Sequence, residues 1–471
     1  MSDARIERDF LGEVEVPQDA LHGVHAARAR ENFPLALRPP KPELIHAFGA
    51  VKQACARTNR LIGALDAERA AAIERAAAEM AEGRLDDAVI VDALAGGAGT
   101  SLNMNVNEVL ANRALQLLGA APGDYARISP LDHVNLHQST NDTFPTALRL
   151  AAIGGCRALE AEVLALQEAF QRKERAFAGV VKVGRTEMQD AVLLTLGREM
   201  SAAAEALGRD RWRIYKCEER LRVVNLGGTA VGTGLGAPRA YIFRVVDELR
   251  GLTGVGFARA ENLVEATANA DVFVEVSGLL KALAATLVKI CGDLRLLSSG
   301  PEAGLGELRL PPRQAGSSIM PGKVNPVIPE AATQAALLAM GLDGVIAHAA
   351  ALGSLELNPF LPLIADALLE SCGLLTRAAR TLRERCVEGL EADEARCRAH
   401  VAASTAAATA LVPLLGYEGA AKVARRAAET GVAVREAAIA LGAVTAEQFD
   451  ELTSPEAVCR LGSPNGTKRE A

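Results

Sequence analysis

This sequence has few aromatic side chains and no excess of basic residues. Aromatic residues make up 3% of the 471 positions, and there is one tryptophan. The 51 Lys and Arg are outnumbered by 58 Asp and Glu, which gives a net charge of −7. A nucleic acid or an anionic membrane surface is therefore not expected as the main partner. The apolar 49% consists mainly of Ala, Leu and Val, which is typical of packed helices and not of an all-β sandwich.

Long apolar runs and paired cysteines are also missing. No stretch approaches 18 uncharged apolar residues, and the opening MSDARIERDF carries charges of both signs, so neither a membrane span nor a secretory signal is expected. The eight cysteines form no C-x-x-C pair, which favours reduced thiols in the cytoplasm over a disulfide framework or a zinc site. The closely spaced histidine pairs lack a third ligand cluster, so no metal ion is expected.

Long helices are predicted in the middle of the chain, because apolar residues recur there at steps of three and four. The expected helices cover residues 145–172, 190–222, 262–298, 327–350 and 361–386. A helix of 30 residues is about 45 Å long, so several of them should lie side by side as an elongated bundle. We therefore predict an all-α fold with three domains: a mixed, mainly helical domain at 1–142, the five-helix bundle at 143–390, and a small helical domain at 391–471. Short helices are expected at 419–429 and 445–452, followed by a polar tail.

Four polar segments that contain glycine interrupt the helical pattern. They are GGAGTSLNMNVN at 96–107, HVNLHQSTNDTFP at 133–145, GRTEMQD at 184–190 and GSSIMPGKVN at 316–325. A capped helix start is the ordinary interpretation of any single one of them. Together they supply hydroxyls, amides, a lysine and helix N-termini, which are groups that suit carboxylate binding. The candidate residues are Thr100, Ser101, Asn103, Ser139, Thr140, Asn141, Thr186, Ser317, Ser318, Lys323 and Asn325.

The fourth segment is the most specific of the four. Its two serines follow a glycine, Pro321-Gly322 favours a mobile loop, and Lys323 adds a cation close by. A serine is a poor base in water. Ser317 could accept a proton only where a cation and backbone donors stabilise its alkoxide in a closed site.

The segment GSSIMPGKVNPVIPE resembles the signature of the aspartase/fumarase superfamily, whose members remove a proton and an amine or hydroxyl from neighbouring carbons and leave a fumarate-like alkene. The other segments that resemble the family, in order, are RIERDFLGEVEVPQDALHGVHAARARENF, GAGTSLNMNVNEVLANRA, QSTNDTFPTA, GRTEMQDA, LGGTAVGTGL, NLVEATANADVFVEVSG, LRLLSSGPEAGLGELRLP and GYEGAAKVARRA. The resemblance implies an all-α, three-domain chain and a homotetramer with a twenty-helix core. It also implies active sites built from three subunits, without a metal or organic cofactor.

The resemblance further implies a role for most of the candidates. Ser317 would be the base on a closing loop, and Lys323 with Asn325 would hold the substrate α-carboxylate. The second carboxylate, which gains enediolate charge, would be bound by Thr100, Ser139, Thr140 and Ser318. The leaving amine would be surrounded by Asn141, Thr186 and Glu187. Donors aimed at such developing charge lower a barrier, typically by several kcal/mol in total.

Two branches of the family compete as the identity of this chain. NLVEATANADVFVEVSG and the opening segment resemble aspartases, whereas LGELRLP is more similar to fumarases. Fumarases carry His in the GRT-x-x-QDA motif where this chain has Glu187, which disfavours fumarase. The prediction is therefore a carbon–nitrogen lyase that converts L-aspartate to fumarate and ammonia. The alternatives, in order, are a related amine-lyase, a class II fumarate hydratase and a non-catalytic structural or binding homologue.

Glu187 also differs from the Gln or His expected in an aspartase. The family places this position near the acid of P-x-x-E, here Glu330, and two carboxylates in one cleft share a proton or hold a cation. One hypothesis is that they hold the substrate's ammonium, including a substituted or quaternary one, as in the elimination of trimethylamine by ergothionase. The competing interpretation is a local pairing of Glu187 with a Lys or Arg.

Overall fold

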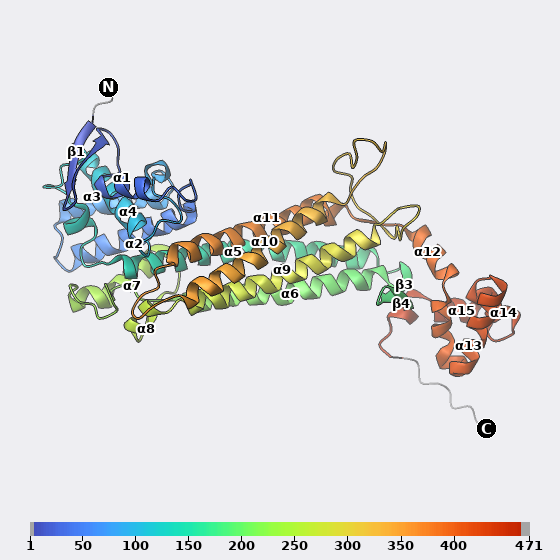
Figure 1. Cartoon of the computed structure of the whole chain (residues 1–471). Helices are drawn as coiled ribbons and strands as arrows, with labels where there is room; N and C mark the ends of the chain where they lie inside the picture. The colour runs from blue at the N-terminus through green and yellow to red at the C-terminus, as the bar shows by residue number, and fades with distance from the viewer. Residues whose placement is uncertain (1–3, 463–471) are drawn as a thin grey trace. The chain divides into compact units, whose positions relative to one another are not determined.

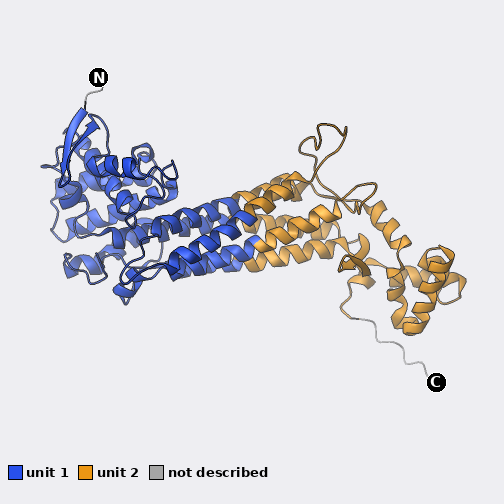
Figure 2. Cartoon of the chain, viewed as in Figure 1, with its two compact units in different colours: residues 1–160, 212–284, 337–376 blue, residues 161–211, 285–336, 377–471 orange. Residues whose placement is uncertain are grey.

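The computed structural model describes residues 4–462, and helices dominate them. The chain forms two compact units, shown in Figure 2. Unit 1 consists of Met1–Glu160, Trp212–Ala284 and Leu337–Thr376, and unit 2 of Ala161–Arg211, Ala285–Ala336 and Arg377–Ala471. The division into three domains remains a prediction, and the predicted polar tail falls on residues 463–471, which lie outside the described residues.

The N-terminal part of unit 1 pairs a small hairpin with short helices (Figure 1). Its elements are β1 Ala4–Asp9, β2 Gly12–Pro17, α1 Val24–Asn32, α2 Pro42–Leu61, α3 Ala67–Ala81, η1 Asp86–Ala88, α4 Thr100–Leu117 and the π-turn η2 Pro130–Val134. Gly99 precedes α4 with φ of 92°, and a Cβ there would lie 2.2 Å from the Phe144 ring. Only glycine fits this turn, so it fixes where α4 begins.

Five long helices each contribute one segment to unit 1 and another to unit 2. They are α5 Thr140–Ala176, α6 Leu196–Leu221, α9 Asp271–Leu297, α10 Val327–Ala351 and α11 Leu361–Arg385. In unit 1, Arg157 of α5 pairs with Glu218 of α6 at 2.7 Å. In unit 2, Arg380 of α11 pairs with Glu162 of α5 at 2.8 Å. The prediction of an all-α fold with five long helices is confirmed.

For two of the predicted helices, the prediction was wrong over the first residues. Residues 190–195 belong to β4 Gln189–Thr195, which forms an antiparallel hairpin with β3 Val181–Thr186, and α6 begins only at Leu196. The predicted helix at 262–298 is two helices, α8 Leu263–Ala268 and α9, because Asn269 adopts an extended conformation. The remaining elements of unit 1 are β5 Val223–Val224, α7 Arg239–Thr253 and β6 Ala258–Arg259, with β5 and β6 parallel.

The C-terminal helices of unit 2 pack on the β3–β4 hairpin. They follow β7 Leu308–Arg309, η3 Val387–Gly389 and β8 Glu391–Ala392, and comprise α12 Glu394–Ala403, η4 Thr405–Leu411, α13 Val412–Thr430, α14 Val434–Ala440, α15 Ala446–Leu452 and α16 Pro455–Cys459. Val183 and Leu193 of the hairpin share one apolar core with Leu411, Val423 and Phe449. The short helices predicted at 419–429 and 445–452 are confirmed within α13 and α15.

Helix α10 stands out by its composition. Among the described residues, α10 is the one single helix that is long and apolar enough to cross a membrane. Helix α12 and residues 405–430 reach the same length and apolar composition only when they are counted together, and they are bent by 76° relative to each other. Only 28% of the most apolar window of α10 is buried within this chain. Packing within the core of a single chain therefore does not explain why α10 is so apolar.

Candidate functional site

The predicted site residues fall into two groups, one in each unit. Unit 1 holds Thr100, Ser101, Asn103, Ser139, Thr140 and Asn141, at the starts of α4 and α5. Unit 2 holds Thr186, Glu187, Ser317, Ser318, Lys323, Asn325 and Glu330, on the β3–β4 hairpin, on the loop that precedes α10 and in its first turn.

The starts of α4 and α5 are joined by a buried asparagine. Asn103, 1% exposed, donates from Nδ2 to Thr140 Oγ1 at 3.0 Å and accepts from the Thr143 hydroxyl at 3.3 Å. Its amide thus holds the two helix starts together. The first-turn N–H groups of a helix carry positive partial charge, so two joined helix starts form a suitable place for a carboxylate. Thr100 is exposed and Ser101 half-buried at the first of them.

The start of α5 is also fixed to the glycine-rich loop at 225–238. Asp142 is fully buried and accepts backbone N–H groups from Ser139 at 3.0 Å, Gly227 at 3.1 Å and Thr229 at 3.0 Å. Burial raises the pKa of Asp142 to about 6, and the three N–H donors oppose that rise. Asn141 donates from Nδ2 to the carbonyl of Ala230 at 2.7 Å. The half-buried Ser139 and Asn141 are therefore held in place by backbone contacts.

Lys52 of α2 supports the same segment, and sequence reasoning missed it. Its side chain is 1% exposed, and Nζ donates to Asn135 Oδ1 at 3.1 Å and to Gln138 Oε1 at 2.9 Å. Burial lowers the pKa of Lys52 to about 8. The available signal was a lone lysine in the apolar stretch AFGAVKQACA, where an unpaired charge would be costly.

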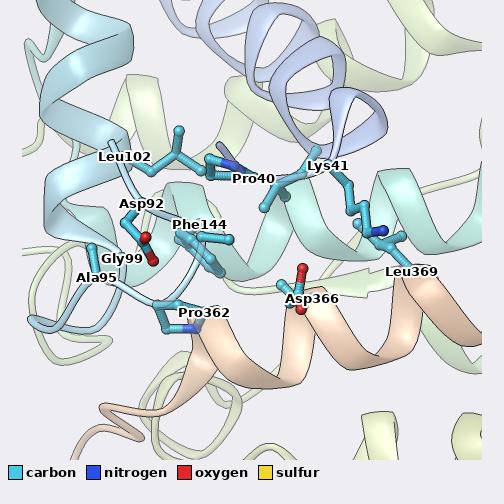
Figure 3. Close-up of a pocket in the computed structure, with 13 residues that line it drawn as sticks. Pro40, Lys41, Asp92, Ala95, Gly99, Leu102, Phe144, Pro362, Asp366 and Leu369 are labelled. Atoms are coloured by element: carbon cyan, nitrogen blue, oxygen red, sulfur yellow. The ribbon is translucent and has the colours of Figure 1, made fainter. Parts of the chain in front are cut away.

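A small pocket lies beside these helix starts in unit 1 (Figure 3). Gly99, Leu102 and Phe144 line one side, and Pro362 and Asp366 of α11 the other. Its lining is mostly apolar, and it has room for little more than a water molecule. It is therefore not a site for a dicarboxylate.

The loop at 316–325 in unit 2 is closed on itself. Gly316 donates its N–H to the carbonyl of Lys323 at 2.7 Å, and Asn325 donates from Nδ2 to the carbonyl of Gly316 at 2.8 Å. Ser317 Oγ accepts the N–H groups of Ile319 at 3.1 Å and Met320 at 3.0 Å. Two donors aimed at one hydroxyl oxygen stabilise negative charge on it, as a serine base requires.

The other polar groups of this loop face outward in the single chain. Ser318 and Lys323 are exposed, while Ser317 and Asn325 are half-buried. A lysine and a serine at the surface of one loop are accessible to a substrate.

The tip of the β3–β4 hairpin carries Thr186 and Glu187, both exposed. Thr186 pairs with Gln189, and the two residues between them, Glu187 and Met188, have φ of 53° and 60°. Two left-handed residues in a two-residue turn make a type I′ geometry that normally recruits Asn and Gly. Neither residue is of that kind, so the tip is strained, and such strain gathers at functional sites.

The two carboxylates singled out in the sequence have different surroundings. Glu330, in the first turn of α10, lies 3.7 Å from Arg295 Nη2, so it already faces a cation. Within the described part of this chain no Lys or Arg side chain bonds to Glu187. The interpretation that Glu187 pairs with a local cation therefore has no support in this chain.

Comparison with known proteins gives matches along nearly the whole chain. Residues 12–341 match the family described as "Lyase", and residues 408–460 match the family described as "Fumarase C C-terminus". A Bacillus aspartate ammonia-lyase is 46% identical over 454 residues, which cover 96% of this chain and 97% of the relative. An aspartate ammonia-lyase from Pseudomonas aeruginosa is 47% identical over 439 residues, covering 93% of each chain.

Solved structures show the same likeness. A structure described as fumarate lyase:delta crystallin from Brucella melitensis, bound to cobalt, has a TM-score of 0.93 and 46% identity, covering 96% of this chain and 99% of that chain. A recombinant class II fumarase from Schistosoma mansoni has a TM-score of 0.89 and 34% identity, with 97% and 99% covered.

Proposed function

Because the chain belongs to the lyase family of the aspartase/fumarase superfamily, we propose that it is an ammonia-lyase that converts L-aspartate to fumarate and ammonia. The observation that carries the proposal is the near full-length identity of 43–47% to relatives named aspartate ammonia-lyase. The loop with Ser317 supports it, because two backbone donors address the hydroxyl that would act as the base.

The elimination begins at the carbon next to the side-chain carboxylate of aspartate. Ser317 Oγ, as the alkoxide, takes one proton from this carbon, and the electron pair left behind delocalises into the carboxylate as an enediolate. The N–H groups of Ile319 and Met320 hold Ser317 ready for this step. Lys323 and Asn325, on the same loop, bind the α-carboxylate.

The developing charge is stabilised at the helix starts of unit 1. The enediolate gains a full negative charge on the second carboxylate, which is bound by the hydroxyls of Thr100, Ser139 and Thr140 together with Ser318. Two of these donors are held in place before the reaction, Thr140 by Asn103 and Ser139 by Asp142, so these two need little reorganisation as the charge forms.

The second step breaks the carbon–nitrogen bond. The enediolate electrons form the alkene, and the ammonium group leaves as neutral ammonia with the bonding pair. Asn141, Thr186 and Glu187 surround the departing nitrogen. The proton accepted by Ser317 then returns to solvent, which restores the alkoxide.

A homotetramer with active sites composed from three subunits is part of the proposal. The exposed apolar residues of α10 support it, since Leu337 and Leu338 are each 53% exposed and Val345 36%. An apolar face of this size on a bundle helix is covered best by a second copy of the same helix. A cytoplasmic location is proposed from the eight cysteines, none of which is in a disulfide.

The exposed carboxylate of Glu187 favours one second candidate. A negative charge without a cation partner beside the leaving group would suit a substituted or quaternary ammonium, so elimination of trimethylamine from a histidine-derived betaine is the alternative reaction. The 34% identity to a class II fumarase is lower than that to the aspartases, and Glu187 replaces the His of that branch, so hydration of fumarate ranks third. Ser317, Lys323 and Asn141 are all present, as an active enzyme requires.

The test is elimination monitored in the near ultraviolet, where the alkene product absorbs. Purified protein is given L-aspartate, L-malate and ergothioneine in parallel, with Ser317→Ala as the control. Turnover of aspartate alone supports the proposal. Turnover of ergothioneine alone replaces it with the second candidate, and turnover of malate alone replaces it with fumarase.

A further inference from the structure

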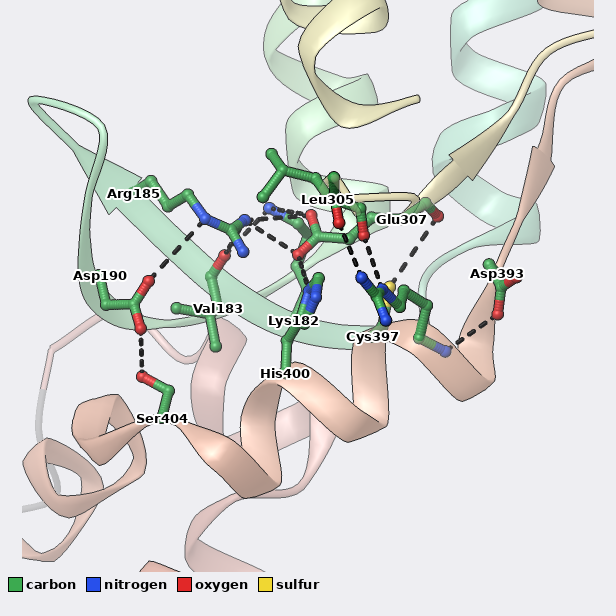
Figure 4. Close-up of polar contacts among 12 residues, drawn as sticks. Lys182, Val183, Arg185, Asp190, Leu305, Glu307, Asp393, Cys397, His400 and Ser404 are labelled. Atoms are coloured by element: carbon green, nitrogen blue, oxygen red, sulfur yellow. Dashed lines mark hydrogen bonds and ion pairs between the residues drawn. The ribbon is translucent and has the colours of Figure 1, made fainter. Parts of the chain in front are cut away.

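A fully buried carboxylate lies at the centre of a polar cluster in unit 2 (Figure 4). The side chain of Glu307 is 0% exposed and has three basic partners. Lys182 Nζ lies 3.2 Å away, Arg185 Nη1 2.9 Å and His400 Nδ1 2.9 Å. Burial raises the pKa of the Glu307 carboxyl, but these three partners outweigh that effect and hold it below its ordinary value.

The partners of Glu307 come from elements that are far apart in sequence. Lys182 and Arg185 belong to β3, Glu307 immediately precedes β7, and His400 belongs to α12. One carboxylate therefore connects a hairpin, a strand and a helix. Lys182 also pairs with Glu199 at 2.7 Å, so loss of the Glu307 carboxylate would leave that lysine one acidic partner while it breaks the connection between the three elements.

Backbone contacts reinforce the same junction. Asp393 at the start of α12 donates its N–H to the carbonyl of Glu307 at 3.0 Å. Arg396 of α12 donates to the carbonyls of Gly304 at 2.7 Å and Leu305 at 3.1 Å. On the hairpin side, the hydroxyl of Ser404 donates to Asp190 at 2.6 Å. The cluster is therefore part of a firm attachment of α12 to both other elements.

One of the three connected elements carries residues of the proposed site, and a second leads to others. Arg185 is next to Thr186 and Glu187 in the strained hairpin tip, and β7 leads after residue 309 into the loop of Ser317. Neither the tip nor the loop packs into the core, since both are largely exposed. Their relative placement within unit 2 depends on the elements that anchor them.

We propose that Glu307 is a positioning residue for the elimination: it fixes the hairpin that carries Thr186 and Glu187 to the strand that leads into the Ser317 loop, and to α12. Glu307 does not touch the substrate. The inference rests on the proposed function for its kinetic consequence, although the anchoring itself is independent of the reaction. A displacement of catalytic groups by about 1 Å costs on the order of 100-fold in rate, so loosening the junction lowers turnover.

The experiment compares Glu307→Gln with a matched control, Glu79→Gln. Glu79 is also a buried carboxylate, 5% exposed and paired with Arg113 at 2.6 Å, but it belongs to unit 1, where it links α3 to α4, whereas the hairpin and the loop belong to unit 2. Both variants are measured for melting temperature, for kcat and KM with L-aspartate, and for amide hydrogen exchange at residues 181–195, 311–325 and 394–404. These three segments report on the hairpin, the loop and α12.

We expect Glu307→Gln to lower kcat on the order of 10- to 100-fold and to speed amide exchange in all three segments. Glu79→Gln should lose stability to a similar extent and keep kcat within about 2-fold. Unchanged kcat and exchange in Glu307→Gln would overturn the proposal, and so would an equal loss of kcat in the control. Faster exchange in a protein whose wild type does not turn over aspartate would refute the proposed function and leave the anchoring role standing.

A second pair of variants covers the case in which Glu307→Gln does not fold. His400→Leu removes one partner of the carboxylate, whereas His400→Asn keeps a donor near the position of Nδ1. His400→Leu should lower kcat about 3- to 10-fold, less than Glu307→Gln, because Lys182 and Arg185 still hold the carboxylate. His400→Asn should restore most of it. Equal kcat in both variants and the wild type would contradict a positioning role.

Discussion

The buried ammonium of Lys52 donates a hydrogen bond to Gln138 Oε1 at 2.9 Å, one residue before Ser139. This contact places a positive charge beneath the segment for which we propose binding of the second carboxylate of the substrate. Because Nζ also bonds Asn135 Oδ1, which accepts from Asn103 Nδ2 at 3.3 Å, the lysine is connected to both helix starts of unit 1. The polar groups at these helix starts are thus supported by a positive charge in the core.

Substitution Lys52→Met should change how stability depends on pH. Burial lowers the pKa of Lys52 to about 8, below its ordinary value of 10.5, so the unfolded chain binds this proton more tightly than the folded one between these values. The wild-type free energy of unfolding should therefore gain relative to Lys52→Met as pH rises from about 8 to 10.5, by up to about 3 kcal/mol. Denaturant unfolding of both proteins at several pH values tests this, and parallel pH curves would refute it.

Substitution Ser317→Ala should remove the base. We expect kcat for L-aspartate to fall on the order of 100- to 10,000-fold, with a much smaller change in KM, because the hydroxyl acts on the proton and not on the bound carboxylates. Steady-state kinetics in the ultraviolet assay measure both constants. Turnover within a few-fold of the wild type would assign the base to another residue.

Substitution Glu187→Gln tests whether the hairpin tip touches the leaving ammonium. The change keeps the size of the side chain and removes its charge. If the carboxylate contacts the ammonium, KM should rise about 10-fold, equivalent to about 1.4 kcal/mol. Unchanged kinetics would show that Glu187 is a tolerated variation.

Substitution Met188→Gly should stabilise the hairpin. Met188 is 79% exposed, so little packing is lost, while its φ of 60° is a conformation that glycine adopts without cost. The free energy of unfolding should rise by about 1 kcal/mol. A chemical denaturation curve that shows a lower value than the wild type would mean that the side chain has contacts in the assembled protein.

The double substitution Leu337→Glu with Leu338→Glu tests the homotetramer. Both side chains are 53% exposed in the single chain, and charges there would have to be desolvated in a subunit interface. Light scattering after gel filtration should show a tetramer for the wild type and smaller species for the variant. A monomeric wild type would contradict the assembly.

The long helices were predictable because their apolar spacing extends over 25 residues or more. The β3–β4 hairpin was not, since the strand at 189–195 runs directly into helix α6 and its alternating pattern is short. The break at Asn269 was missed for a similar reason: one extended residue interrupts an otherwise continuous apolar pattern. Local periodicity does not reveal such short interruptions.

Sequence motifs indicated the candidate site residues. They did not indicate the buried groups that support these residues. Lys52 reaches Gln138 across 86 residues of sequence, and Glu307 reaches Arg185 across 122. Partnerships over such separations depend on tertiary packing, which no local pattern contains. A lone charge in an apolar stretch, as at Lys52, is the one sequence signal that indicated such a partner.

The most direct test of the account is the ultraviolet measurement of product formation from L-aspartate by the wild type and by Ser317→Ala. We expect steady formation of fumarate by the wild type and its near loss in the variant. No product from aspartate with the wild type, or equal rates in the two proteins, would contradict the claim that this chain is an aspartate ammonia-lyase with a serine base.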